Sequence, residues 1–66
     1  MRLTINGSIF EAKEASTIMD LLDELSIKPD RVAVEVNLSI VRKADYSVFR
    51  LNEGDRVEIV NFVGGG

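Results

Sequence analysis

The chain has 66 residues, enough for one small domain, and 45% of them are hydrophobic. It has no cysteine and no histidine, so the usual thiolate nucleophile, disulfide framework, general base and zinc ligand are missing. Eleven acidic and eight basic residues give a net charge of −3, which argues against nucleic-acid and anionic-membrane partners. We therefore expect neither a self-contained hydrolase nor a metalloenzyme, and no catalytic residue, bound cofactor or metal site.

The N-terminal sequence carries no sign of a targeting or membrane segment. Every apolar run is far shorter than the roughly 20 residues that span a bilayer. The chain enters an alternating pattern directly after Met1, without the apolar h-region of a signal peptide. We therefore expect a cytoplasmic protein. For a small acidic chain, a monomer is the simplest expectation when the protein is alone.

The first predicted element is a β-hairpin. Residues 2–5 alternate between polar and apolar side chains, as in a half-buried strand. The Asn6-Gly7 dipeptide that follows is the strongest short hairpin signal in the chain. The return strand is expected over residues 8–13, but Ile9 and Phe10 are adjacent, so the pattern leaves open which of them faces inward.

The second predicted element is an amphipathic helix of about two and a half turns. Ser16 or Thr17 can cap its start, and Asp20 lies three residues after Thr17, where a carboxylate complements the positive helix end. Pro29 prevents the helix from continuing further. The apolar stripe that recurs at helical spacing consists of Ile18, Leu21, Leu22 and Leu25.

The second half of the chain predicts further strands. Valines alternate with other residues over 32–36, and their β-branched side chains favour a strand. The pattern then predicts a turn at 37–39, a short strand at 40–42, an irregular stretch with room for one helical turn at 43–47, a segment at 48–51 that can be extended, a turn at 52–55 with Gly54 at positive φ, and a last strand at 56–62.

These elements predict a two-layer α+β domain, because one helix stripe can cover one face of one sheet. The strand–helix–strand unit implies a right-handed crossover and some parallel pairing. The order resembles the β-grasp, or ubiquitin-like, fold, in which a mixed sheet of four to five strands packs on one main helix. In that fold the first and last strands lie side by side. The domain is expected to span residues 1–63, followed by a flexible glycine tail at 64–66.

The glycine tail is the most informative feature of the sequence. Glycine loses the most backbone entropy on ordering and has no side chain to pack, so a folded element gains nothing from Gly64, Gly65 and Gly66 in a row. Fully extended, three residues reach roughly 10 Å. That length would carry the Gly66 carboxylate into a narrow pocket of another protein. The alternative interpretation is a frayed terminus without a role.

The last strand offers a candidate docking surface. If its residues 57 and 59 face the helix, then Val60 and Phe62 point to the other face of the sheet. Together with Val63, they would form an exposed apolar patch suited to a partner protein. The alternative is that the strand bends near its end and Phe62 covers the edge of the core.

Other charged and aromatic groups have ordinary explanations. The carboxylates of Asp20, Asp23 and Glu24 could be a metal or acid–base cluster, but their spacing favours the solvated face of the helix. The aromatic side chains of Tyr46 and Phe49 are expected to form a partial lid on the small core. The adjacent basic residues at 42–43 are either ordinary surface or a means of steering an acidic partner, and the sequence leaves both possibilities open.

Residues 52–66 resemble the C-terminal part of the ThiS family, the sulfur carriers of thiamine biosynthesis. The resemblance covers the whole chain, including its length, the Asn6-Gly7 hairpin, the Leu21-Leu22 helix and the Glu53-Gly-Asp55 turn. Its most specific part is the last strand running into Val63-Gly-Gly-Gly66. A double glycine alone is shared with the molybdopterin-synthase small subunit and with ubiquitin-like modifiers.

The resemblance implies a protein substrate rather than an enzyme. In this family a ThiF-type adenylyltransferase uses ATP to adenylate the terminal carboxylate, here Gly66. Sulfur from a cysteine desulfurase or rhodanese-like donor then displaces AMP and leaves a thiocarboxylate, whose sulfur passes to thiazole synthase. Three alternatives remain, namely a molybdopterin-type carrier, a modifier joined through Gly66 to lysines, and a β-grasp binding module with an idle tail.

Overall fold

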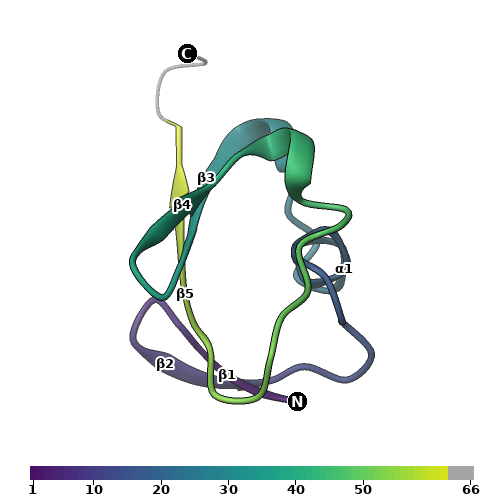
Figure 1. The fold of residues 1–66 in the computed structure, drawn as a ribbon, viewed down its shortest axis with the longest axis vertical. Helices are drawn as coiled ribbons and strands as arrows, with labels where there is room; N and C mark the ends of the chain where they lie inside the picture. Colours follow the sequence, from purple (N-terminus) through teal and green to yellow (C-terminus); the bar gives the residue numbers. More distant parts are fainter. Residues whose placement is uncertain (63–66) are drawn as a thin grey trace.

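The computed structural model describes residues 1–62, and in this part of the chain a five-stranded mixed sheet packs on one α-helix (Figure 1). This arrangement confirms the expected α+β class and the β-grasp architecture. The elements in chain order are β1 (Arg2–Ile5), β2 (Ser8–Glu11), α1 (Ile18–Glu24), the 3-10 turn η1 (Pro29–Arg31), β3 (Val32–Val36), β4 (Ser39–Val41), the 3-10 turn η2 (Lys43–Asp45) and β5 (Arg56–Asn61).

The strand order places the last strand in the middle of the sheet. The order is β2-β1-β5-β3-β4, and β1 and β5 run parallel while the other pairs are antiparallel. The prediction that the first and last strands lie side by side is therefore correct. As a consequence, β5 is hydrogen-bonded on both edges before it ends on one side of the molecule (Figure 1).

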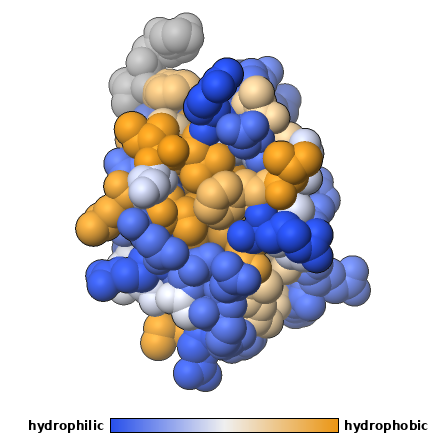
Figure 2. Space-filling view, viewed as in Figure 1, coloured by the Kyte–Doolittle hydropathy of each residue, from blue (hydrophilic) through white to orange (hydrophobic). Residues whose placement is uncertain are grey.

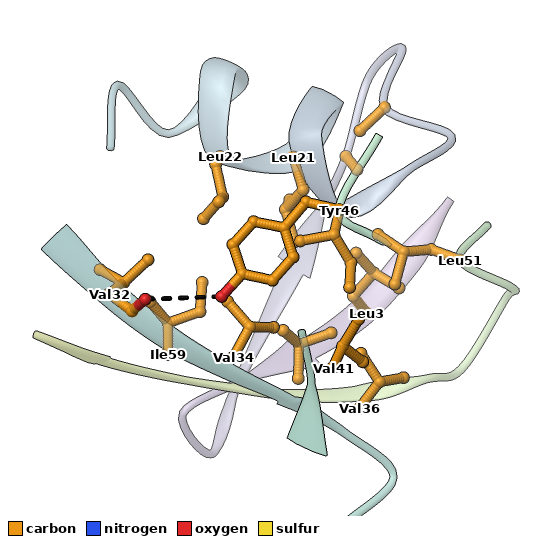
Figure 3. Close-up of a cluster of buried hydrophobic side chains, with 14 residues drawn as sticks. Leu3, Leu21, Leu22, Val32, Val34, Val36, Val41, Tyr46, Leu51 and Ile59 are labelled. Atoms are coloured by element: carbon orange, nitrogen blue, oxygen red, sulfur yellow. Dashed lines mark hydrogen bonds between the residues drawn. The ribbon is translucent and has the colours of Figure 1, made fainter. Parts of the chain in front are cut away.

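The core lies between the sheet and α1. In the β3–β5 pair, Val34 lies opposite Ile59 and Val36 lies opposite Val57, and all four side chains are buried. Figure 3 shows Val34, Val36 and Ile59 on the side of the sheet that faces Leu21 and Leu22 of α1. Burying a side chain of this size contributes about 1.5–3 kcal/mol. The alternation predicted for both strands is thus the feature that fixes which face of the sheet is covered.

The helix stripe is confirmed, although the helix is shorter than predicted. Ile18, Leu21 and Leu22 are completely buried, and Leu25 packs partly against the core. The helix has seven residues, about two turns. It ends because Leu25 is the C-cap and Ser26 adopts a left-handed φ of 59°, which no helix continues. No helix within residues 1–62 is long and apolar enough to cross a membrane.

The predicted hairpin at Asn6-Gly7 is present, and the structure settles the orientation of its second strand. Both turn residues have positive φ, 49° and 85°, as the favoured two-residue hairpin turn requires. Phe10 is half-buried against the core, whereas Ile9 is 71% exposed on the other face. Phe10 lies directly opposite the buried Leu3 in the β1–β2 pair, so pairing rather than local pattern decides its direction.

Several predicted strand boundaries were wrong. The second strand ends at Glu11 instead of residue 13, because the Lys13 N–H donates to the Glu24 carboxylate at 2.9 Å rather than to the sheet. Residues 48–51, for which the sequence allowed an extended segment, contribute an isolated bridge between Arg50 and Thr17 and no strand of the sheet. The limits of β4 and β5 differ from the predicted ones by a single residue.

Tyr46 belongs to the core, which corrects the prediction that it is part of a lid. Its side chain is 2% exposed, and its hydroxyl donates to the carbonyl oxygen of Val32 at 3.4 Å (Figure 3). Burial raises the pKa of the Tyr46 phenol above its ordinary value. The turn η2 directs this residue inward, while Phe49 packs at the periphery and is only half-buried.

Candidate functional site

The candidate site is the C-terminal end of β5, and a side chain from the first hairpin fixes the strand that leads to it. Asn6 Oδ1 accepts the Ile59 N–H at 2.8 Å, and Asn6 Nδ2 donates to the Ile59 carbonyl at 3.1 Å. The paired residues of β1 and β5 end at Ile5. The Asn6 side chain continues the pairing by taking the place of a further β1 backbone unit opposite Ile59. Asparagine tolerates the left-handed backbone of the turn better than most residues. It can therefore occupy the turn and also supply the amide that bonds to Ile59.

The opposite hairpin holds the start of β5 in a similar way. Asn37, with φ of 51°, donates its N–H to the Arg56 carbonyl at 2.7 Å and accepts the Arg56 N–H on Oδ1 at 3.0 Å. Its Nδ2 also donates to the buried carboxylate of Asp55 at 3.0 Å. Both hairpin turns therefore attach to β5 through an asparagine, and the strand has little freedom to shift along its neighbours.

A backbone hydrogen bond connects the last described residue, Phe62, to the segment before β3. The Phe62 N–H donates to the carbonyl oxygen of Arg31 at 2.8 Å, one residue beyond the end of β5. Four residues predicted to form the tail and part of the docking patch, Val63, Gly64, Gly65 and Gly66, lie outside the described residues. The structure therefore defines the base from which these residues start.

Val60 and Phe62 are exposed on the side of the sheet away from α1. Their side chains are 60% and 54% exposed, so Phe62 is not buried inside the domain, as the docking interpretation requires. Val60 lies opposite Ala33 of β3, and the exposed Ile40 lies on β4, the strand on the other side of β3. Figure 2 shows apolar side chains gathered on the part of the surface near the ends of β4 and β5. The docking role itself stays a prediction.

The Asp20 carboxylate caps the start of α1. Asp20 accepts hydrogen bonds from the Ser16 N–H at 3.2 Å and hydroxyl at 2.9 Å and from the Thr17 N–H at 3.2 Å, while Thr17 Oγ1 accepts the Asp20 N–H at 3.1 Å. The bonds from Ser16 are the main reason that the pKa of Asp20 lies below its ordinary value, with Thr17 adding to the effect. Asp23 and Glu24 are exposed, as a solvated face requires, and residues 1–62 contain no cluster of three side chains suited to a metal ion.

A group of basic side chains close to the end of β5 was missed by sequence reasoning. Lys43 in η2 forms a salt bridge with Asp30 in η1, so the two turns lie side by side. The hydrogen bond from Lys43 lowers the pKa of Asp30 most, and the nearby charges of Lys43, Arg31 and Lys28 lower it further. Only the adjacent pair at 42–43 stood out in the sequence, because Lys28 and Arg31 join it through folding alone.

The ThiS family model matches residues 3–66, nearly the entire chain. The chain belongs to the ThiS family. The sulfur carrier protein ThiS of Bacillus subtilis is 40% identical to it over 65 residues, which cover 97% of this chain and 98% of that protein. The crystal structure of a thiamine biosynthesis protein (ThiS) from Geobacter metallireducens matches the fold with a TM-score of 0.84 at 30% identity, over 100% of both chains.

Other relatives of this ThiS-family chain are longer proteins. A thiazole synthase of Paramagnetospirillum magneticum is 46% identical to it over 66 residues, which are all of this chain but 20% of that protein. A thiazole synthase of Magnetococcus marinus is 38% identical over the same length and the same share. The chain therefore spans about one fifth of the length of these curated relatives.

Proposed function

We propose that this ThiS-family chain is a sulfur carrier for the synthesis of the thiazole ring of thiamine. The observation that carries the proposal is the match with the sulfur carrier protein ThiS of Bacillus subtilis over nearly the full length of both proteins. In this role the chain is a protein co-substrate, and the chemistry is catalysed by the enzymes that bind it. The central, doubly anchored β5 supports this role because it gives the last residues a fixed base.

The cargo site is the carboxylate of Gly66. A carboxylate is a poor electrophile, so one of its oxygens first attacks the α-phosphorus of ATP on a ThiF-type enzyme, and pyrophosphate leaves. The terminal sulfur of a donor persulfide then attacks the acyl carbon, and AMP leaves. A second thiol cleaves the resulting acyl disulfide, forming a disulfide with the donor and releasing the thiocarboxylate. All of these thiols belong to other molecules, because this chain contains no cysteine.

Glycine at positions 64–66 suits this chemistry for a steric reason. Water must be excluded from the acyl-adenylate, since it would otherwise hydrolyse it, and a narrow tunnel achieves this. A side chain next to the acyl carbon would collide with the wall of such a tunnel, whereas glycine has none. Because the Phe62 N–H is bonded to Arg31, the residues proposed to enter the tunnel are those that follow, and an extended residue spans roughly 3.5 Å.

Thiazole synthase is the proposed recipient of the sulfur. Two relatives named thiazole synthase contain a region similar to this entire chain within one much longer protein. Joining a carrier region to the enzyme that consumes its cargo raises the effective concentration of one for the other. That arrangement supports the same partnership for this chain, with Val60, Phe62 and Val63 as the docking residues.

The test is intact-protein mass spectrometry after incubation with ATP, a ThiF-type enzyme and a persulfide donor. A mass gain equal to one oxygen-to-sulfur exchange, mapped to Gly66, is the expected result. A variant without residues 65–66 is the matched control and should gain nothing. No gain in the full chain, with the enzyme active on a known carrier, would contradict the proposal, and isopeptide conjugates in cells would indicate a modifier instead.

A further inference from the structure

The charges of this chain are distributed unevenly along its surface. Residues 28–31 and 42–45 contain four basic and two acidic residues, whereas the rest of the chain contains four basic and nine acidic residues. The whole chain has a net charge of −3, whereas these two segments together have a net charge of +2. We call their basic side chains the basic end, and it consists of Lys28, Arg31, Arg42 and Lys43.

The fold collects these segments at the exit of β5. The Lys43–Asp30 salt bridge joins η2 to η1, and the Phe62 N–H is bonded to the Arg31 carbonyl at 2.8 Å. Figure 1 shows both turns at the end of the molecule where β5 finishes, far from the N-terminus. Lys28 and Arg31 flank Asp30 in the chain, and Lys43 reaches the same carboxylate through the salt bridge; all three charges lower the pKa of Asp30.

Most of this positive charge is not neutralised within the domain. In the portion from residue 1 to residue 62, Lys28, Arg31 and Arg42 are exposed and take part in no salt bridge. The side chain of Phe62 is 54% exposed at the same end, and its N–H is bonded to Arg31 of this group. An apolar centre beside charged groups is the usual composition of a protein–protein interface.

We propose that the basic end docks on an acidic surface of thiazole synthase, around the opening that admits the residues after Phe62. This inference rests on the proposed function, because it identifies the surface through which the carrier meets its recipient. The acidic remainder of the carrier is repelled by the same surface, so the charge distribution turns the molecule with its C-terminal end forward. Electrostatic steering of this kind raises association rates by about 10- to 1000-fold at low ionic strength.

A protein surface fits these charges better than a nucleic acid or a membrane does. An extended polyanion or an anionic bilayer would also meet the faces that carry nine carboxylates and four basic residues, and would be repelled there. A local acidic patch on a folded partner meets only the basic end. Complementary patches of limited size act mainly on the association rate and on orientation.

The test measures association rates between the full-length carrier and thiazole synthase from the same organism, by stopped-flow fluorescence. The basic-end variant is R31Q/R42Q, and the matched control is K13Q/R50Q, which removes two exposed basic side chains elsewhere. Both variants have the same net charge. We expect the basic-end variant to associate about tenfold more slowly at 10 mM salt and the control less than about twofold more slowly. The difference should vanish near 1 M salt, where the Debye length is about 3 Å.

Equal rates for the two variants, or a difference that persists at high salt, would overturn the inference. So would tight binding of the wild type to phosphatidylserine vesicles or to single-stranded RNA that is weakened by R31Q/R42Q alone. The proposed function is tested by a different measurement, namely sulfur uptake on Gly66. If the wild type takes up sulfur but the two variants associate at equal rates, only the docking role of the basic end is rejected. If the wild type neither takes up sulfur nor binds thiazole synthase, both proposals are rejected.

Discussion

Asn6 occupies both backbone hydrogen-bonding groups of Ile59 with its side-chain amide. The two bonds, 2.8 Å and 3.1 Å long, join the first hairpin turn to the fourth residue of the last strand. They continue the parallel pairing of β1 and β5 past Ile5, where the backbone of β1 turns away. The strand that carries the candidate site is thus fixed by a residue 53 positions earlier in the chain.

We expect Asn6→Gly to lower the free energy of unfolding by about 1–2 kcal/mol, because each lost hydrogen bond contributes about 0.5–1.5 kcal/mol. Glycine keeps the left-handed turn, so the loss reports the amide bonds to Ile59. The measurement is urea unfolding followed by circular dichroism. Ser26→Gly is the control, since Ser26 has a similar φ of 59° and its side chain forms no hydrogen bond within residues 1–62. Equal effects in both variants would show that the amide contributes nothing.

The parts of the fold that rest on local signals were predicted from the sequence. The Asn6-Gly7 turn and the stripe that begins at Ile18 each depend on residues within a few positions of one another. The inward direction of Tyr46 was not predicted, because it depends on η2 and on Val32, which is 14 positions away. The choice between Ile9 and Phe10 likewise depends on pairing with β1, and alternation alone does not determine it.

In the candidate site, too, features that depend on local sequence can be predicted, and features that depend on distant contacts cannot. Alternation along β5 predicted the exposure of Val60, whereas the sequence left open whether Phe62 is exposed or covers the core edge. The basic end requires η1 and η2 to meet, and the Asp30–Lys43 pair that joins them spans 13 positions. A sequence pattern of a few residues holds no signal for such a contact, and only the neighbouring charges at 42–43 were visible.

Asp20 predicts a loss of stability in acid. Its pKa in the folded protein lies below the unfolded value of 3.8, because hydrogen bonds from Ser16 and Thr17 favour the carboxylate. The stabilisation is therefore present above the unfolded pKa and is lost as the pH falls through the folded pKa. We expect the melting temperature of Asp20→Asn to lie below that of the wild type at pH 7 and to approach it at about pH 2. The same separation at both pH values would show that the carboxylate charge is not involved.

The apolar patch at the end of β5 predicts a loss of partner binding without a loss of stability. We expect the double variant V60S/F62S to bind a ThiF-type enzyme and thiazole synthase at least about tenfold more weakly, since burial of each side chain contributes about 1.5–3 kcal/mol. Its melting temperature should stay close to that of the wild type, because the two side chains are 60% and 54% exposed. Isothermal titration calorimetry and thermal melts provide the two measurements.

The control for this prediction is Ile9→Ser. Ile9 is also a large exposed apolar residue on the sheet, but it lies on β2, at the opposite edge from β4. The exchange should leave binding to both enzymes unchanged. If Ile9→Ser weakened binding as much as V60S/F62S, the partner would use general surface hydrophobicity. A large drop in the melting temperature of V60S/F62S would instead give these residues a role in the fold.

Gly66 offers the most direct test of the tunnel argument. Gly66→Ala places one methyl group beside the acyl carbon, where it would collide with a wall close enough to exclude water. Displacing the reacting carboxylate by about 1 Å is expected to slow adenylation by roughly 10- to 100-fold, measured as ATP–pyrophosphate exchange with a ThiF-type enzyme. The fold should be unaffected, because the sheet is already closed on both edges of β5 before this residue. Unchanged exchange in Gly66→Ala would mean that the carboxylate is adenylated in an open site, and a role for glycine there would then have to come from chain flexibility alone.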